Sequence, residues 1–106
     1  MRRTIVLVLV AALAVLTLAG CSTPTATGGA VEIKEFAFVP ASVQVAVGGA
    51  VTWTNADAVT HTVKGEGWGS GDLAKGATFS NTFDTAGTFA YSCGVHPSMT
   101  GSVIVK

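Results

Sequence analysis

Apolar and polar residues alternate along most of the chain after residue 30. In residues 42–47 and 51–54, β-branched or aromatic side chains recur at every second position, and residues 31–36 largely alternate in the same way. Residues 60–63, 77–83, 88–92 and 101–106 continue the pattern. Period-two alternation of such side chains is typical of β-strands that bury one face. The sequence therefore predicts seven or eight short strands, and no segment after residue 30 keeps the 3.6-residue period of a helix.

Glycine and proline separate these segments. Pro40, Gly48-Gly49 and Ala86-Gly87 stand between predicted strands, and residues 65–76 carry five glycines. We expect this glycine-rich stretch to be an irregular surface excursion in which Trp68 caps the core or an edge. Many short strands divided by such turns predict a single all-β sandwich. Its expected core consists of the valines and of Phe36, Phe38, Trp53, Phe79, Phe83 and Phe89.

The start of the chain has a different pattern. Met1-Arg2-Arg3 is basic, and residues 5–16 are an unbroken apolar run of isoleucine, valine, leucine and alanine. A bilayer span takes about 20 apolar residues, so this run has the length of a secretory signal instead. Leu18-Ala19-Gly20-Cys21 then resembles the lipobox of bacterial lipoprotein precursors, which implies cleavage before Cys21 and lipid on its sulfur. An ordinary signal peptide followed by an incidental cysteine is the alternative.

These features divide the chain into three parts. We expect a lipoprotein signal peptide in residues 1–20, a lipid-anchored flexible linker in 21–29 and a folded domain in 30–106. Residues 22–29 hold no bulky apolar side chain, as befits a tether. The protein is expected to be exported and anchored on the extracytoplasmic side of a membrane, at the cell surface or in the periplasm.

Charge narrows the range of partners. Without residues 1–20, four lysines and six acidic residues leave a formal charge of −2. Because no basic patch is available to hold phosphate, nucleic acid is not an expected partner. Attachment to the membrane would then come from lipid on Cys21, and stable anchoring takes two acyl chains.

Three metal-binding side chains follow the last but one predicted strand. Cys93, His96 and Met99 stand three residues apart, and His61 is the other histidine of the chain. Thiolate and thioether are soft donors and imidazole is borderline, so the set suits copper. Two histidines, a cysteine and a weak methionine form the ligand set of a blue-copper electron-transfer site. A metal would also occupy a thiol left unpaired in an oxidising compartment.

Other chemistries fit the same residues less well. Taken singly, a buried cysteine or methionine is commonly core packing, and a histidine is commonly a surface residue. Structural zinc prefers four cysteine or histidine ligands. A c-type haem needs a second cysteine before the histidine, where Val95 stands. A nucleophilic pair of Cys93 and His61 would need a substrate cleft, for which the chain is small. An enzyme is therefore not expected.

The order of these residues resembles a known family. The motifs that carry the resemblance are Phe38-x-Pro40, Gly49-x-Val51-x-Trp53-x-Asn55-x-Asp57, His61-Thr62-Val63 and Tyr91-x-Cys93-x-x-His96-Pro97-x-Met99-x-Gly101. They are similar to those of small cupredoxins of the plastocyanin/amicyanin type, and the short ligand loop resembles that of amicyanin. The resemblance implies a Greek-key β-sandwich with one type 1 copper ion at one end. Thr62 departs from the asparagine that relatives often carry.

The resemblance also implies how electron-transfer partners would reach the copper ion. The ring edge of His96 would face solvent within an apolar patch formed by Ala58, Val95 and Pro97. Redox proteins, one a donor and one an acceptor of electrons, would dock there transiently on a monomeric carrier. Two other functions remain open: a copper-binding carrier or delivery lipoprotein without redox turnover, and a structural β-sandwich that binds no metal.

Overall fold

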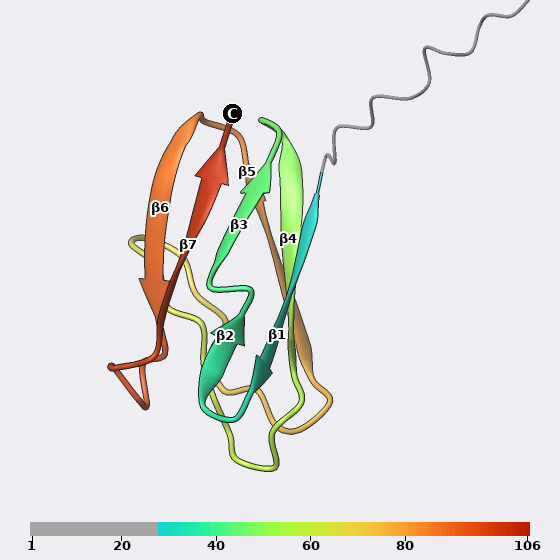
Figure 1. The fold of residues 1–106 in the computed structure, drawn as a ribbon, viewed down its shortest axis with the longest axis vertical. Coiled ribbons are helices and arrows are strands. Elements are labelled where there is room, and N and C mark those ends of the chain that lie inside the picture. Colours follow the sequence, from blue (N-terminus) through green and yellow to red (C-terminus); the bar gives the residue numbers. More distant parts are fainter. Residues whose placement is uncertain (1–27) are drawn as a thin grey trace, which may run out of the picture.

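The computed structural model describes residues 28–106, and within them it contains seven strands and no helix (Figure 1). The predicted signal peptide in residues 1–20 and the predicted lipid site Cys21 lie outside the described residues. The strands are β1 (Gly29–Lys34), β2 (Ala37–Val39), β3 (Ser42–Val45), β4 (Gly49–Asn55), β5 (Thr78–Phe83), β6 (Gly87–Ser92) and β7 (Thr100–Val105).

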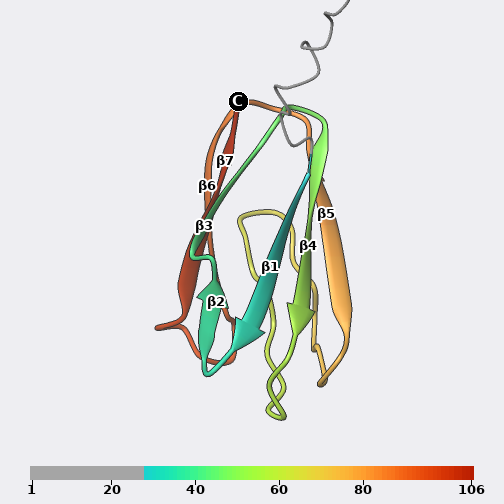
Figure 2. The ribbon, with the colours of Figure 1, turned by 45° about the vertical axis from the view of Figure 1, so that its right-hand side comes forward.

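The strands form two facing sheets (Figures 1 and 2). One sheet has the order β2-β1-β4-β5 and the other the order β3-β7-β6. β1 pairs with β4, and β3 with β7, in parallel, whereas the remaining pairs are antiparallel. Since β1 and β4 are separated in sequence by strands of both sheets, the chain crosses between layers. The predicted all-β sandwich is confirmed.

Alternation along the strands builds the core between the sheets. β4 alternates strictly, and its Val51 and Trp53 are fully buried. The Trp53 ring lies 5.6 Å from that of Trp68 and 5.3 Å from that of Tyr91. Trp68 thus packs against the core from the glycine-rich excursion, as the sequence predicted. Burying one large apolar side chain contributes about 1.5–3 kcal/mol, so these residues are the main source of stability.

Two expectations about the strands were wrong. Residues 60–63 form no strand; His61 and Lys64 make only isolated bridges, to Leu73, Gly69 and Ser92. Local residue type favours an extended chain, but a strand also needs a neighbour in register. Phe36 is not in the core, because it is 51% exposed. It lies in the turn after β1, where Glu35 and Phe36 adopt left-handed backbone conformations, so the alternation of the strand does not extend to it.

The loops of interest gather at one end of the sandwich. The turn between β1 and β2, the segment after β4 and the loop between β6 and β7 lie at the lower end of the ribbon (Figure 1). The fold therefore brings residues 35–36, 56–62 and 93–99 toward a common pole. Within residues 28–106 no helix is present that is long and apolar enough to cross a membrane.

Candidate metal centre

Three of the four predicted metal-binding residues converge at this pole. One ligand atom from each of His61, Cys93 and His96 lies within 4.8 Å of the others. Cys93 Sγ is 3.9 Å from His61 Nδ1 and 3.8 Å from His96 Nδ1. His61 and Cys93 are fully buried, whereas His96 is half-buried. Both imidazoles therefore turn the same nitrogen toward one sulfur, and the three atoms are close enough to hold one metal ion.

A tight loop positions Cys93, His96 and Met99. Cys93 follows β6 directly, and its N–H donates to the Met99 carbonyl at 3.0 Å. The Met99 N–H donates in turn to the His96 carbonyl at 2.9 Å. β7 begins at the next residue, Thr100, so the loop is closed by two strands of one sheet. The Met99 side chain is buried beside this loop, where it belongs to the core cluster.

His61 comes from a different loop, which Asn55 organises. Asn55 is the last residue of β4 and is fully buried. Its side-chain nitrogen donates to the carbonyls of Val59 and Leu73, and its oxygen accepts from the Asp57 N–H. The backbone of His61 then exchanges two hydrogen bonds with that of Leu73. Buried polar groups are normally paired in this way, so one asparagine fixes the path of the chain up to His61.

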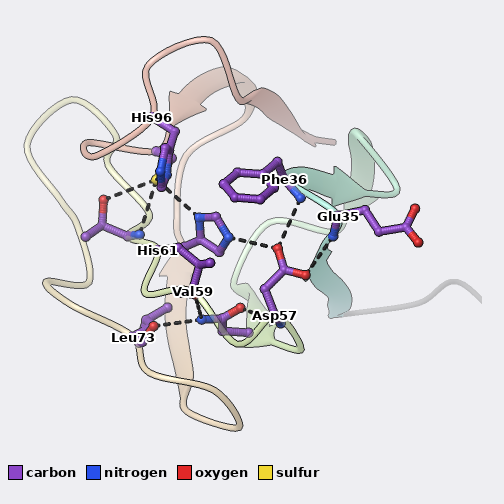
Figure 3. A network of polar contacts seen from close by, with 10 residues as sticks. Glu35, Phe36, Asp57, Val59, His61, Leu73 and His96 are labelled. Atoms are coloured by element: carbon purple, nitrogen blue, oxygen red, sulfur yellow. Dashed lines mark hydrogen bonds and ion pairs between the residues drawn. The ribbon is translucent and has the colours of Figure 1, made fainter.

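Asp57 holds the far side of the His61 ring. Its Oδ2 lies 2.9 Å from His61 Nε2 (Figure 3). The backbone N–H groups of Glu35 and Phe36 donate to the same carboxylate at 2.7 and 3.1 Å, and these bonds are the main reason that the pKa of Asp57 lies below its usual value. An ionised carboxylate only accepts hydrogen bonds, so Nε2 carries the hydrogen. His61 Nδ1 is then left with a free lone pair facing Cys93.

Phe36 covers the two histidines from outside. Its ring meets those of His61 and His96 edge-on, at centroid distances of 5.2 and 5.1 Å (Figure 3). Glu35 and Phe36 both adopt left-handed backbone conformations, with φ of 53° and 58°. Such conformations cost energy for residues other than glycine, and the two hydrogen bonds to Asp57 offset that cost. Sequence reasoning missed these roles of Asp57 and Phe36; the four-residue spacing between Asp57 and His61 was the available signal.

The surroundings of Cys93 favour its thiolate form. Burial raises the pKa of the thiol, but the Thr62 N–H, both histidine side chains and the His96 N–H outweigh it and lower the pKa to about 6. Thr62 N lies 3.4 Å from Cys93 Sγ. The thiolate is the form that binds a metal. One thiolate and two imidazole lone pairs, with a thioether buried nearby, match the donor set that copper prefers.

The predicted docking residues lie at the surface of the same pole. Ala58, Val95 and Pro97 are all exposed, and Val95 and Pro97 flank the half-buried His96. Two more exposed apolar residues, Phe36 and Val59, lie in the loops beside them; the sequence had placed Phe36 in the core and assigned no role to Val59. The rim of the site is therefore largely apolar.

Known proteins share both the sequence pattern and the fold. Residues 5–105 match the family described as cupredoxin-like domain. Amicyanin-alpha of Methylorubrum extorquens is 33% identical over 90 residues, which cover 76% of this chain and 76% of that protein. Amicyanin of Paracoccus denitrificans is 36% identical over 83 residues, covering 72% of this chain but only 63% of that protein.

Solved structures give the same picture. An oxidized amicyanin variant aligns with a TM-score of 0.71 at 32% identity, over 76% of this chain and 83% of that one. The Cu(I) form of another amicyanin variant aligns with a TM-score of 0.71 at 30% identity, over 80% of this chain and 88% of that one. A purple cupredoxin from Nitrosopumilus maritimus aligns with a TM-score of 0.69 at 26% identity, over 74% of this chain and 99% of that one.

Proposed function

The chain belongs to the cupredoxin-like family as a small blue copper protein of the amicyanin type, and on this premise we propose that it carries single electrons between redox proteins. The observation that supports this most is the convergence of Cys93 Sγ with Nδ1 of His61 and His96 at one pole. Its cofactor is one type 1 copper ion. When bound, copper supplies the one-electron chemistry.

We assign the four ligands to particular atoms. His61 Nδ1, Cys93 Sγ and His96 Nδ1 would hold the ion strongly, and the Met99 thioether would be a weak fourth ligand. The lowered pKa of Cys93 supports this, because the thiol loses its proton at little cost. Asp57 supports it too, since it leaves the correct nitrogen of His61 free. Because hydrogen bonds hold both ligand loops in place, we expect little movement when the charge of the site changes.

Electrons would enter and leave through His96. It is the one half-buried member of the three converging residues, and exposed apolar residues flank it. We propose that Ala58, Val95 and Pro97 form the docking patch, with Phe36 and Val59 at its border. Weak electron-transfer encounters use small interfaces, and an apolar rim of this kind allows contact without strong retention. The carrier works as a monomer that meets donor and acceptor in turn.

The sequence of residues 1–29 supports a proposal about where the protein acts. We propose that residues 1–20 are removed on export and that lipid on Cys21 anchors the domain through a short linker on the extracytoplasmic side. The absence of a basic patch supports lipid over charge as the means of attachment. Fractionation of cells that express the parent and Cys21→Ser tests this: the parent is expected with membranes and the variant in the soluble fraction. Equal distribution of the two would contradict it.

Addition of Cu(II) to the purified protein tests the copper site. We expect an intense blue colour from sulfur-to-copper charge transfer, lost in Cys93→Ser and retained in the neighbouring Ser92→Ala. A colourless parent protein, or a colour that survives in Cys93→Ser, would rule the site out.

Electron self-exchange tests the function. Rapid exchange between the Cu(I) and Cu(II) forms, seen as broadened nuclear magnetic resonance signals of the histidines, is expected of a carrier. Slow exchange, together with ready loss of copper to a chelating acceptor, would instead favour the copper-delivery function.

A further inference from the structure

Thr62 makes three polar contacts that join the two ligand loops. Its N–H donates to Cys93 Sγ at 3.4 Å. Its hydroxyl oxygen accepts a hydrogen bond from the Gly94 N–H at 2.7 Å and lies 3.8 Å from Cys93 Sγ. The residue is half-buried and follows His61 directly. A single side chain thus lies between the first ligand histidine and the ligand cysteine.

The direction of the contact with sulfur follows from the donors available. A threonine hydroxyl has one hydrogen to donate and can accept two hydrogen bonds. The Gly94 N–H uses one of its acceptor positions and leaves the hydrogen free. A thiolate has no hydrogen, so between Thr62 Oγ1 and Cys93 Sγ the hydroxyl must be the donor. Within residues 28–106 the structure records no other protein acceptor for this hydroxyl.

Gly94 sets where the hydroxyl can lie. A Cβ at position 94 would be 3.0 Å from Thr62 Oγ1, which is closer than ordinary van der Waals contact. The absence of a side chain therefore lets the backbone N–H of the loop approach the hydroxyl and hold it. This bond holds the oxygen 3.8 Å from the sulfur and leaves the hydroxyl hydrogen free to turn toward it.

We infer that Thr62 helps to set the reduction potential of the copper site by donating a second hydrogen bond, from its hydroxyl, to the Cys93 sulfur. The inference rests on the proposed function, because it presumes that Cys93 binds copper. Hydrogen bonds to the sulfur stabilise negative charge on it and weaken its donation to the metal. The oxidised ion depends on that donation more than the reduced ion does. The hydroxyl therefore favours the reduced form and raises the potential.

Variants of Thr62 in the copper-loaded protein test the inference. Thr62→Val keeps the shape but removes the hydroxyl, and we expect a lower reduction potential by voltammetry. Thr62→Ser and Thr62→Ala form a second pair that differs only in the hydroxyl. We expect the reduction potential of Thr62→Ser to stay near that of the parent, and the potential of Thr62→Ala to be lowered as in Thr62→Val. This second pair decides the matter even where Thr62→Val folds poorly.

A control and a second measurement separate the sulfur contact from general disturbance. Thr52 also makes a hydroxyl contact, to Ser80 at 2.7 Å, but on the β4–β5 pair. We expect Thr52→Val to leave the potential unchanged. Resonance Raman spectra give a direct readout, since transfer into D₂O should shift the Cu–S stretching bands more in the parent than in Thr62→Val.

The outcomes are distinct. A blue parent whose potential equals that of all three Thr62 variants overturns this inference and leaves the proposed function standing. A reduction potential of Thr62→Ser as low as that of Thr62→Ala also overturns the inference. A parent that takes up copper without blue colour refutes the proposed function itself.

Discussion

Asp57 joins three parts of the pole through a single carboxylate. It accepts hydrogen bonds from the backbone of Glu35 and Phe36 and from the His61 ring. At the scale of residues this decides which nitrogen of His61 is free, and it places the Phe36 ring against both histidines. A ligand that is already oriented loses less freedom when it binds a metal.

Asp57→Ala is expected to weaken copper binding. Removal of a partner that orients a ligand histidine typically costs about 10- to 100-fold in metal affinity. Competition with a chelator of known affinity measures the change. Asp84→Asn also removes a negative charge, but an exposed one in the segment between β5 and β6, and it should leave the affinity unaltered. Equal affinity in Asp57→Ala and the parent would show that Asp57 does not support the site.

Substitution of Met99 should lower or raise the reduction potential, depending on the residue that replaces it. Met99→Gln supplies an amide oxygen, a harder donor that stabilises Cu(II), so copper stays bound and the potential falls. Met99→Leu removes the donor, and we expect the potential to rise. Voltammetry on both variants checks the order. An unchanged potential in Met99→Gln would remove Met99 from the ligand set.

The Cys93 thiol should make the stability of the metal-free protein depend on pH. Its pKa is lowered from 9.0 to about 6 in the folded chain. The thiolate therefore contributes stability in full above pH 9.0, and the contribution is lost as the pH falls through about 6. Urea unfolding of the parent and of Cys93→Ser across this range measures it. The difference between them should grow as the pH rises, and a constant difference would contradict the lowered pKa.

At the scale of elements, the excursion between β4 and β5 does two tasks. Its first part carries Asp57, His61 and Thr62 to the pole, and its second part returns Trp68 to the core. Backbone bridges from Lys64 to Gly69 and Ser92 hold it in place without forming a sheet. The Trp68 ring lies directly over Gly65, where an added Cβ would collide with the indole.

Gly65→Ala should therefore destabilise the fold. The new methyl group would displace Trp68 from its packing against Trp53 and Phe79. Overpacking of this kind costs about 1–3 kcal/mol in the free energy of unfolding. Urea denaturation measures the loss. In a Trp68→Ala background the same change should cost much less, because the clash is gone; an equal cost in both backgrounds would show that another contact is responsible.

At the scale of the whole molecule, a small sandwich supports a metal site that in turn supports the sandwich. The described domain spans only residues 28–106, a size at which the core alone provides modest stability. His61 is attached to the excursion after β4, and Cys93, His96 and Met99 to the loop between β6 and β7. An ion between them would link loops that follow strands of the two different sheets.

Copper should accordingly raise the melting temperature. At a free concentration 100 times its Kd, a ligand that binds only the native state adds about 2.7 kcal/mol. For a domain of this size that corresponds to a rise of more than about 10 °C. Thermal unfolding with and without copper checks it. Cys93→Ser should show little rise, and a similar rise in that variant would place the stabilising copper elsewhere.

Local sequence patterns determine much of the fold of this protein. Strand alternation, as in Val51 and Trp53, follows from the period of the extended backbone, so the sandwich was predictable. That Cys93, His96 and Met99 lie in one tight loop was predictable for a different reason, because residues three apart in a short connection between strands stay close together. The match to the cupredoxin-like family confirms the resemblance that these motifs indicated.

Tertiary structure decided what depends on neighbours far apart in sequence. Residues 60–63 look like a strand, yet they bond only at isolated points because the chain offers no continuous partner there. Phe36 looks like core, yet a left-handed turn held by Asp57, 21 residues away, leaves it exposed over the histidines. The contact of Thr62 with Cys93 spans 31 residues. Local periodicity carries no information about such pairings, because only the packed fold determines which loops meet.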